Sequence, residues 1–118
     1  MSDKVNLAEK LASFDEPFQP KIVATYNDNK VQVAKTRGPF LWHSHPETDD
    51  LFLVLKGRLL IELRDRTVEL GEGELYVVPR GVEHRPRADG EAHVLLIEPT
   101  GTRNTGDADA QPAPEVEI

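Results

Sequence analysis

The sequence predicts an all-β fold, either a sandwich or a barrel, and three features indicate it. Short segments of alternating or continuous apolar residues recur from residue 22 to residue 99. Turn-forming residues such as Gly, Asp, Asn and Pro separate these segments at short intervals. Only one stretch, near the N-terminus, has the spacing of an amphipathic helix. With 118 residues, the chain is expected to form a single domain.

A short N-terminal helix is predicted over residues 7–13. Asn6 can cap its first turn, and Glu9, three residues later, completes a capping box. Leu7 and Leu11 are four residues apart and therefore share one face of the helix. A helix this short is marginal on its own. We therefore expect its apolar face to pack against the rest of the domain.

Strand-like periodicity begins at residue 22. Segments 22–26 and 31–35 flank Asn27-Asp28-Asn29-Lys30, a sequence that favours a hairpin turn. Further strands are predicted at residues 40–45, 50–56, 58–64, 67–70, 74–79 and 93–99. Turns are predicted between them at Gly57, Asp65-Arg66, Gly71 to Gly73, Arg80-Gly81 and Asp89-Gly90.

The composition changes after Pro99. Residues 101–118 are rich in small and polar residues, and only Val116 and Ile118 are large aliphatics. One Arg against two Asp and two Glu gives this segment a net charge of −3, out of −7 for the whole chain. We therefore expect residues 1–100 to form the domain and residues 101–118 to form a flexible acidic tail.

Composition excludes several classes of protein. The absence of Cys excludes disulfides, thiolate metal sites and a cysteine nucleophile. The chain has 21 acidic and 14 basic residues, and this net negative charge argues against nucleic-acid binding. The longest apolar run, residues 51–55, is far shorter than the ~20 residues of a membrane span. The charged N-terminal segment lacks the apolar stretch of a signal peptide, so a cytoplasmic location is expected.

The histidines suggest a metal site. His43 and His45 are two residues apart, so on a strand both side chains leave the same face, about 7 Å apart along the backbone. Asp50 opens the next strand, and His84 follows a later turn. Three imidazoles and one carboxylate suit one divalent transition metal, such as Fe, Mn, Ni, Co or Zn. A His-x-His pair also occurs in structural or surface roles, so by itself it leaves metal binding open.

Residues 38–57, GPFLWHSHPETDDLFLVLKG, resemble the first motif of the cupin family. That motif contains Gly, His-x-His, three or four residues, Glu, six residues and Gly. His43 and His45 match its histidines, and Asp50 stands at the position of the Glu, six residues before Gly57. Asp is one methylene shorter than Glu. Direct ligation by Asp50, ligation through water and no ligation therefore all stay open.

Residues 73–84, GELYVVPRGVEH, resemble the second cupin motif, which reads Gly, five residues, Pro-x-Gly, two residues and His. All four positions match in register, with His84 as the histidine. The order and separation of the two motifs also match across roughly residues 30–100. The resemblance implies a small, single-domain jelly-roll barrel with a divalent metal inside one end. It implies as metal ligands His43, His45, Asp50 and His84.

The resemblance implies no single reaction, because cupins include dioxygenases, isomerases, other enzymes and non-catalytic binding modules. We expect a metal-dependent enzyme that binds a small oxygenated molecule in the barrel and performs dioxygenase- or isomerase-type chemistry. One alternative is a non-catalytic module that binds or senses a small ligand. Another is a barrel whose metal site has been lost.

Two further predictions concern residues outside the motifs. Trp42 and Leu51, Leu53 and Leu55 should face away from the barrel interior, which favours a homodimer through the outer sheet. The alternative is that the N-terminal helix and hairpin cover this face within one chain. His93 begins a strand whose alternate residues, Leu95 and Ile97, are predicted to lie in the core. His93 is therefore expected in the pocket or in its wall.

Overall fold

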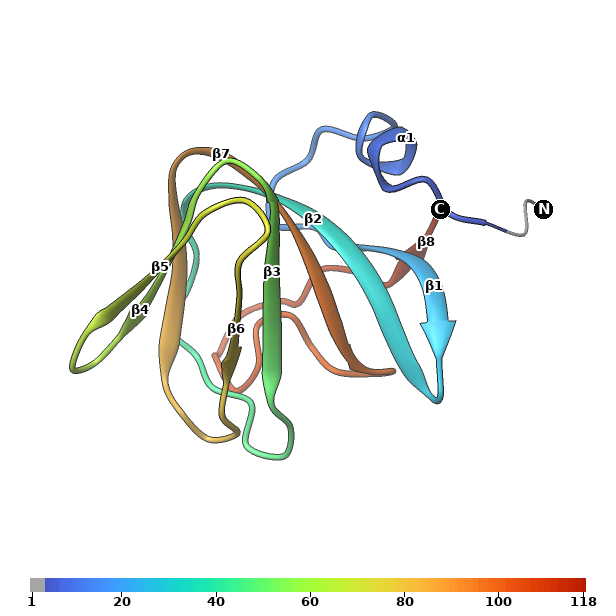
Figure 1. The fold of residues 1–118 in the computed structure, drawn as a ribbon. Coiled ribbons are helices and arrows are strands. Elements are labelled where there is room, and N and C mark those ends of the chain that lie inside the picture. The colour runs from blue at the N-terminus through green and yellow to red at the C-terminus, as the bar shows by residue number, and fades with distance from the viewer. Residues whose placement is uncertain (1–3) are drawn as a thin grey trace.

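The computed structural model describes residues 4–118 and confirms an all-β barrel with one short helix (Figure 1). Within that part of the chain, no helix is both long enough and apolar enough to cross a membrane. In chain order the elements are α1 (Leu7–Leu11), β1 (Lys21–Tyr26), β2 (Asn29–Pro39), β3 (Asp50–Lys56), β4 (Leu59–Leu63), β5 (Thr67–Leu70), β6 (Leu75–Val78), β7 (His84–Pro99) and β8 (Val116–Glu117).

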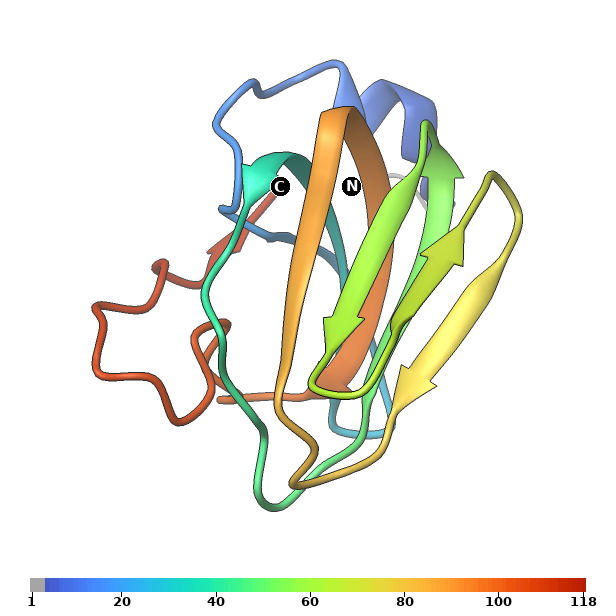
Figure 2. The same ribbon diagram turned by 90° about the vertical axis from the view of Figure 1, so that its left-hand side faces the viewer.

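One sheet curls around to form the barrel (Figure 2). Its strands run in the order β5-β4-β7-β2-β1-β8, and β3 joins this path by pairing with β7 and β6. The long strand β7 pairs with β2 along one side. On its other side, β7 pairs first with β4, through residues 84–87, and then with β3, through residues 93–97. Because β7 pairs with β4 along one part of its length and with β3 along the other, it connects these two strands in the barrel.

Strand β7 is longer than the sequence predicts. It runs from His84 to Pro99 without interruption, so the turn predicted at Asp89-Gly90 is wrong. Pairing with β2 holds this region in the sheet, and the register shifts between Arg37 and Gly38. Ala92, Val94, Leu96 and Glu98 are the buried residues of its second half. The prediction that Leu95 and Ile97 lie in the core is therefore also wrong, because these two half-buried residues face outward.

Residues 40–45 do not form the predicted strand. Strand β2 and its pairing with β7 end at Pro39. Beyond that point only one isolated bridge, between His43 and His84, joins the segment to another part of the sheet. The tight hairpin between β1 and β2 is formed as predicted. Asn27 and Asp28 both adopt positive φ angles, of 46° and 64°, as a two-residue turn of this type requires.

Two apolar clusters stabilise the domain. The main cluster fills the barrel and includes Phe52, Val54, Leu59, Ile61 and Val94. The smaller cluster lies outside the sheet, where Leu11 and Phe14 pack against Val33 of β2. Helix α1 therefore covers part of the outer face, as expected. Its cap is also the predicted one, since Asn6 accepts a hydrogen bond of 3.0 Å from the Glu9 amide, although the helix ends at Leu11.

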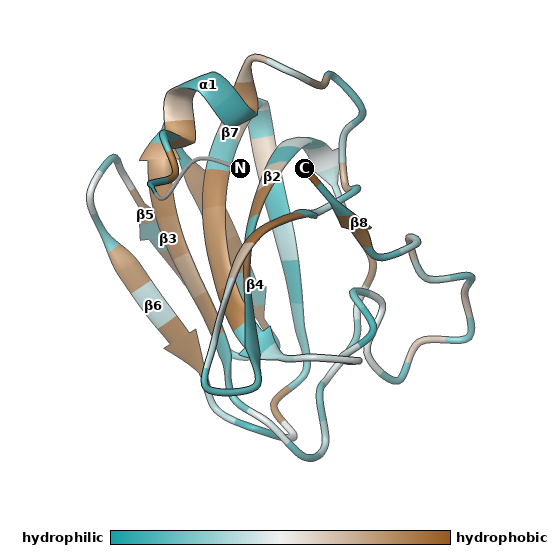
Figure 3. Cartoon of the chain, turned by 90° about the vertical axis from the view of Figure 1, so that its right-hand side faces the viewer, coloured by the Kyte–Doolittle hydropathy of each residue, from teal (hydrophilic) through white to brown (hydrophobic). Residues whose placement is uncertain are grey.

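The rest of the outer face remains apolar and partly exposed. Strands β3, β6 and β7 carry most of the hydrophobic residues on this side of the molecule (Figure 3). Leu75 and Val77 of β6 are 57% and 38% exposed, and they pair with the half-buried Leu53 and Leu51 of β3. Trp42 is not among these apolar residues of β3 and β6. It is half-buried beneath the Arg64 guanidinium, whose central carbon is 3.9 Å from the centroid of the Trp42 ring.

The C-terminal segment, for which we expect a flexible tail, lies against the barrel in this structure. Its end forms β8, which pairs in parallel with β1, and Ile118 packs against the outer apolar cluster. Glu115 accepts a hydrogen bond of 2.7 Å from the buried Lys30 ammonium. Thr105 is only 3% exposed. Glu115 therefore has a specific partner on the barrel, which composition alone does not reveal.

Candidate metal centre

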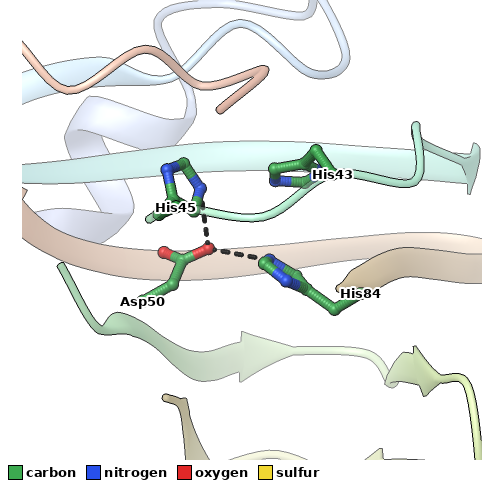
Figure 4. A group of neighbouring side chains, drawn as sticks. All are labelled: His43, His45, Asp50 and His84. Carbon is green, nitrogen blue, oxygen red and sulfur yellow. Dashed lines mark hydrogen bonds and ion pairs between the residues drawn. The ribbon is translucent and has the colours of Figure 1, made fainter. Parts of the chain in front are cut away.

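The three histidines and Asp50 converge at one point inside the barrel (Figure 4). Each of the four offers one ligand atom, and these atoms all lie within 4.8 Å of one another. Two ligands on one ion are separated by at most about 4.4 Å when each bond is ~2.2 Å long. Small rotations of the side chains therefore suffice to close the four atoms around a single ion.

Backbone pairing between the two motifs brings His43 and His84 together. The His43 amide donates to the His84 carbonyl over 3.0 Å, and the His84 amide donates to the His43 carbonyl over 2.9 Å. The imidazole centroids of the two residues are 4.4 Å apart. The two-residue spacing then directs His45 to the same side as His43, although the segment is a loop rather than a strand.

Two of the imidazoles are oriented for metal binding. Nδ1 of His43 lies 2.9 Å from the Leu41 carbonyl oxygen, and Nδ1 of His84 lies 2.9 Å from the Val82 carbonyl oxygen. A carbonyl oxygen can only accept a hydrogen bond, so Nδ1 carries the proton in both rings. In the neutral form of each ring, Nε2 then has a lone pair available for a metal. Such backbone partners commonly fix the tautomer of metal-binding histidines.

Asp50 lies between the other ligands. Its Oδ2 is 3.3 Å from Nε2 of His45 and 3.1 Å from Nε2 of His84. The neighbouring Asp49 points elsewhere, and its Oδ1 accepts a hydrogen bond of 2.9 Å from the Arg80 amide. The shorter Asp side chain thus reaches the same point as the histidines because its Cα is the first of β3.

The electrostatics of the site depend on burial and on Asp50. Burial lowers the pKa of His43 to about 4, so its imidazole is neutral at pH 7. Burial also acts to lower the pKa of His45, but the hydrogen bond and charge of Asp50 raise it overall. Burial acts to raise the pKa of Asp50, yet hydrogen bonds from His45 and His84 bring it down to about 2.

This donor set fits a divalent transition metal. Three imidazole nitrogens and one ionised carboxylate match the ligands that such ions prefer, and all four residues are buried. A cation bound between these groups would replace the hydrogen bonds that link Asp50 to the imidazoles of His45 and His84. The set leaves coordination positions available on a six-coordinate ion.

A cavity of about 60 Å³ adjoins His43, His45 and Asp50. One water molecule needs roughly 10–15 Å³ of such volume, so the cavity holds only a few waters. Apolar side chains form most of its wall, among them Phe18 and Phe40, whose rings stack with centroids 5.0 Å apart. The space beside His43, His45 and Asp50 is therefore suited to a small molecule.

Glu98 is a buried carboxyl group in the wall of this cavity, and sequence reasoning missed it. It is 6% exposed and follows Val94 and Leu96 on the inward face of β7. Sequence reasoning assigned the opposite face of this strand to the core. The alternation of β7 is itself the signal that could have located Glu98, once Val94 and Leu96 were chosen as the inward residues.

Neighbouring side chains contact one carboxylate oxygen of Glu98, Oε1, and not the other, Oε2. Gln32 Nε2 donates to Oε1 over 2.9 Å, and Lys30 Nζ lies 3.7 Å from the same oxygen. Within residues 4–118, Oε2 has no hydrogen-bond partner and keeps some accessible surface, and Glu98 lines the cavity. Burial, and next the charge of Asp50, raise the pKa of Glu98 to about 7.

His93 lies outside the site. Its Nε2 is 2.9 Å from Glu91 Oε2, and it pairs in register with Lys35 of β2. It does not line the cavity beside the metal ligands. Of the four histidines, only the three in the cupin-like motifs meet.

Comparison with known proteins identifies the family. The Cupin domain family, Cupin_2, matches residues 29–98. This chain is a cupin. An uncharacterised protein of Bacillus subtilis, YdbB, is 39% identical over 99 residues, which cover 83% of this chain and 88% of that protein. The same family explains why the two motifs have the order and spacing found here.

Solved cupin structures have the same fold. A cupin-2 domain protein from Shewanella frigidimarina has a TM-score of 0.80 and 40% identity, covering 80% of this chain and 93% of its own. The protein NMB1881 from Neisseria meningitidis has a TM-score of 0.76 and 30% identity, covering 83% of this chain and 100% of its own. The family and its buried His-His-Asp-His group support a metal-binding cupin.

Proposed function

We propose that this cupin is an enzyme that uses one divalent transition metal to act on a small oxygenated molecule, with dioxygenase- or isomerase-type chemistry. The proposed metal ligands are His43, His45, Asp50 and His84. The observation that supports an enzyme is Glu98, a buried carboxyl group in the wall of the same cavity. The ion would supply Lewis acidity, which polarises an oxygen of the substrate.

Glu98 is the proposed acid or base. Gln32 and Lys30 hold Oε1, so Oε2 is the atom that can give a proton to the substrate or take one from it. A group whose pKa of about 7 lies near neutral pH can serve in either direction. The metal's positive charge acts to lower this pKa, so the loaded protein favours the base.

The cavity wall constrains the substrate. Phe18, Phe40 and Phe52 contribute apolar surface, while Glu98 and Asn104 are polar groups in addition to the proposed metal ligands. A small molecule with an oxygen toward the ion and an apolar portion against these rings fits this distribution. A molecule larger than the present cavity of about 60 Å³ requires its wall to move.

A binding module is the alternative function, supported by the small size of the cavity and its mainly apolar wall. The two functions differ in what Glu98 must do. An enzyme needs its proton transfer, whereas a module that only binds its ligand needs no proton transfer at all.

The test uses metal-loaded protein and a panel of small phenols, keto acids and hydroxylated carbonyl compounds, with products followed by mass spectrometry and NMR. Turnover by the wild type, lost in His84→Ala and reduced at least ~100-fold in Glu98→Gln, supports the enzyme. Stoichiometric binding of a panel compound without any product favours the binding module. Glu98→Gln conserves shape and removes only the titratable proton.

We also propose that the protein is a homodimer that pairs through the outer face of β3 and β6. Four apolar side chains lie side by side there: Leu51, Leu53, Leu75 and Val77. The two-fold pairing of identical faces would bury them against the same residues of a second copy. Helix α1 covers only the neighbouring part of the sheet, around Val33.

A further inference from the structure

The segment between β7 and β8 returns to the loop that carries two of the proposed metal ligands. Ser44 stands between His43 and His45, and it forms three hydrogen bonds with Asp107. The Ser44 amide donates to Asp107 Oδ1 over 2.7 Å, and Ser44 Oγ donates to Oδ2 over 2.8 Å. In return, the Asp107 amide donates to the Ser44 carbonyl over 3.0 Å. Both carboxylate oxygens of the exposed Asp107 thus accept hydrogen bonds from the buried Ser44.

Gly106 permits this close approach. A Cβ at this position would overlap the Ser44 carbonyl oxygen and would lie 2.9 Å from Cδ2 of His43. Its φ angle of +55° is also one that residues with a side chain rarely adopt. Position 106 therefore accepts only Gly without displacing the loop or the imidazole beside it.

The segment is anchored on both sides of Asp107. Before it, Thr105 is buried and Asn104 Nδ2 donates to the Phe18 carbonyl over 3.3 Å. After it, Glu115 accepts from Lys30, and β8 pairs with β1. These contacts fix the position of Asp107 independently of Ser44. Its hydrogen bonds can therefore hold Ser44 in place.

The loop needs such support because strand pairing does not provide it. The backbone of residues 40–45 has a single bridge to the sheet, at His43. No pairing with another strand holds the peptide groups of Ser44, whose amide and carbonyl instead bond to Asp107. Fixing these groups sets the directions in which the two flanking imidazoles leave the backbone.

We propose that Asp107 is a positioning residue of the metal centre, and that residues 104–107 are an integral part of the site. This inference rests on the proposed metal ligands. It assigns the C-terminal segment a role in preorganising His43 and His45 for the ion. Partners of metal ligands commonly contribute ~10–100-fold to metal affinity.

The test measures Co²⁺ affinity by chelator competition, together with the visible absorption of bound Co²⁺, which reports ligand geometry. Asp107→Ala should weaken Co²⁺ binding at least ~10-fold and shift the absorption bands. Asp107→Asn, which can still bond to Ser44, should restore much of the affinity and the wild-type spectrum. Asp109→Ala, an equal loss of charge two residues away, is the matched control and should match the wild type.

A purely structural role would lower stability without altering the Co²⁺ spectrum of the folded fraction. A second variant, Ser44→Ala, loses only the bond from Oγ to Oδ2, and it should shift the spectrum in the same direction by less. Wild-type affinity and spectrum in both Asp107→Ala and Ser44→Ala would overturn the inference and leave the metal site intact. Failure of the wild type to bind Co²⁺ would overturn both proposals.

Discussion

Oδ2 of Asp50 lies 3.1 Å from Nε2 of His84, although the two residues are 34 positions apart in the chain. Asp50 begins β3 and His84 begins β7, and both are almost fully buried. The contact joins the carboxylate of the first motif to the imidazole of the second. It places the four proposed ligands within reach of one ion.

The first prediction concerns His84. His84→Ala should abolish stoichiometric metal in protein purified without added metal, because a buried Nε2 oriented by Val82 is lost. Elemental analysis measures the metal. His93→Ala is the matched control, since His93 lies outside the cavity, and it should retain wild-type metal. Wild-type protein that neither carries metal nor gains it on titration with Fe, Mn, Ni, Co and Zn contradicts the site.

The second prediction tests whether the Asp50 carboxylate is a metal ligand. Asp50→Asn keeps the shape of the side chain but removes the charge between His45 and His84, so Zn²⁺ affinity should fall at least ~10-fold. Competition with a chromogenic chelator measures it. Asp49→Asn, at the adjacent position facing Arg80, should leave the affinity unchanged. Equal affinities in wild type and Asp50→Asn would remove Asp50 from the ligand set.

The third prediction is that metal affinity rises with pH. In the metal-free protein the pKa of His45 is raised because Asp50 stabilises the charged imidazole, and a metal must displace that proton. Below the pKa of His45, affinity should fall by about tenfold per pH unit for each proton released. Calorimetry at pH 6 and pH 8, in buffers of different ionisation enthalpy, measures the affinity and the proton release. Affinity independent of pH would mean that no proton is displaced.

The fourth prediction concerns the stability of the metal-free protein. Because burial raises the pKa of Glu98 to about 7, the folded state binds its proton more tightly than the unfolded state, whose value is about 4.5. The stability from protonated Glu98 is complete below about pH 4.5 and is lost as pH rises through about 7. The groups facing this carboxyl are Asp50, His45, Lys30 and Gln32.

Glu98→Gln removes this dependence. The unfolding free energy of the variant minus that of the wild type should rise by about 3 kcal/mol between pH 4.5 and pH 8. Urea denaturation of metal-free protein at several pH values measures the difference, in which the other titrating groups cancel. A constant difference between the two proteins would show that folding does not raise the pKa of Glu98.

The fifth prediction tests the proposed dimer. Leu75→Glu places a charge on the exposed outer face of β6 and should convert the dimer to a monomer with unchanged metal content. Size-exclusion chromatography with light scattering gives the mass. Tyr26→Glu, at an exposed position at the end of β1, is the control and should remain dimeric. A monomeric wild type at micromolar concentration contradicts the proposal.

Much of the fold could be predicted because its signals are local. Alternation along β3 correctly separated the inward Asp50, Phe52 and Val54 from the outward leucines. The spacing within the two motifs was enough to select the four residues that meet in the structure. Both signals depend only on the geometry of short chain segments and on the chemistry of their side chains.

The remaining features depend on contacts between distant segments. Residues 40–45 have the composition of a strand, but their only backbone bonds to a strand are the bridge between His43 and His84 and the bond from the Phe40 amide to the Pro86 carbonyl. Glu98 is 66 positions from Gln32, so nothing near it in sequence marks it as a buried and held carboxyl. Asp107 is 63 positions from Ser44, and its segment has the composition of a flexible tail.

The sequence by itself therefore determined the class of fold, the family and the identity of the proposed ligands. Only the tertiary structure decided which face of β7 is inside, and hence that Glu98 faces the cavity. It also decided that residues 104–107 close against Ser44. The physical reason is that strand periodicity and motif spacing are encoded within a few residues. Hydrogen bonds across the barrel instead require the whole chain to be folded.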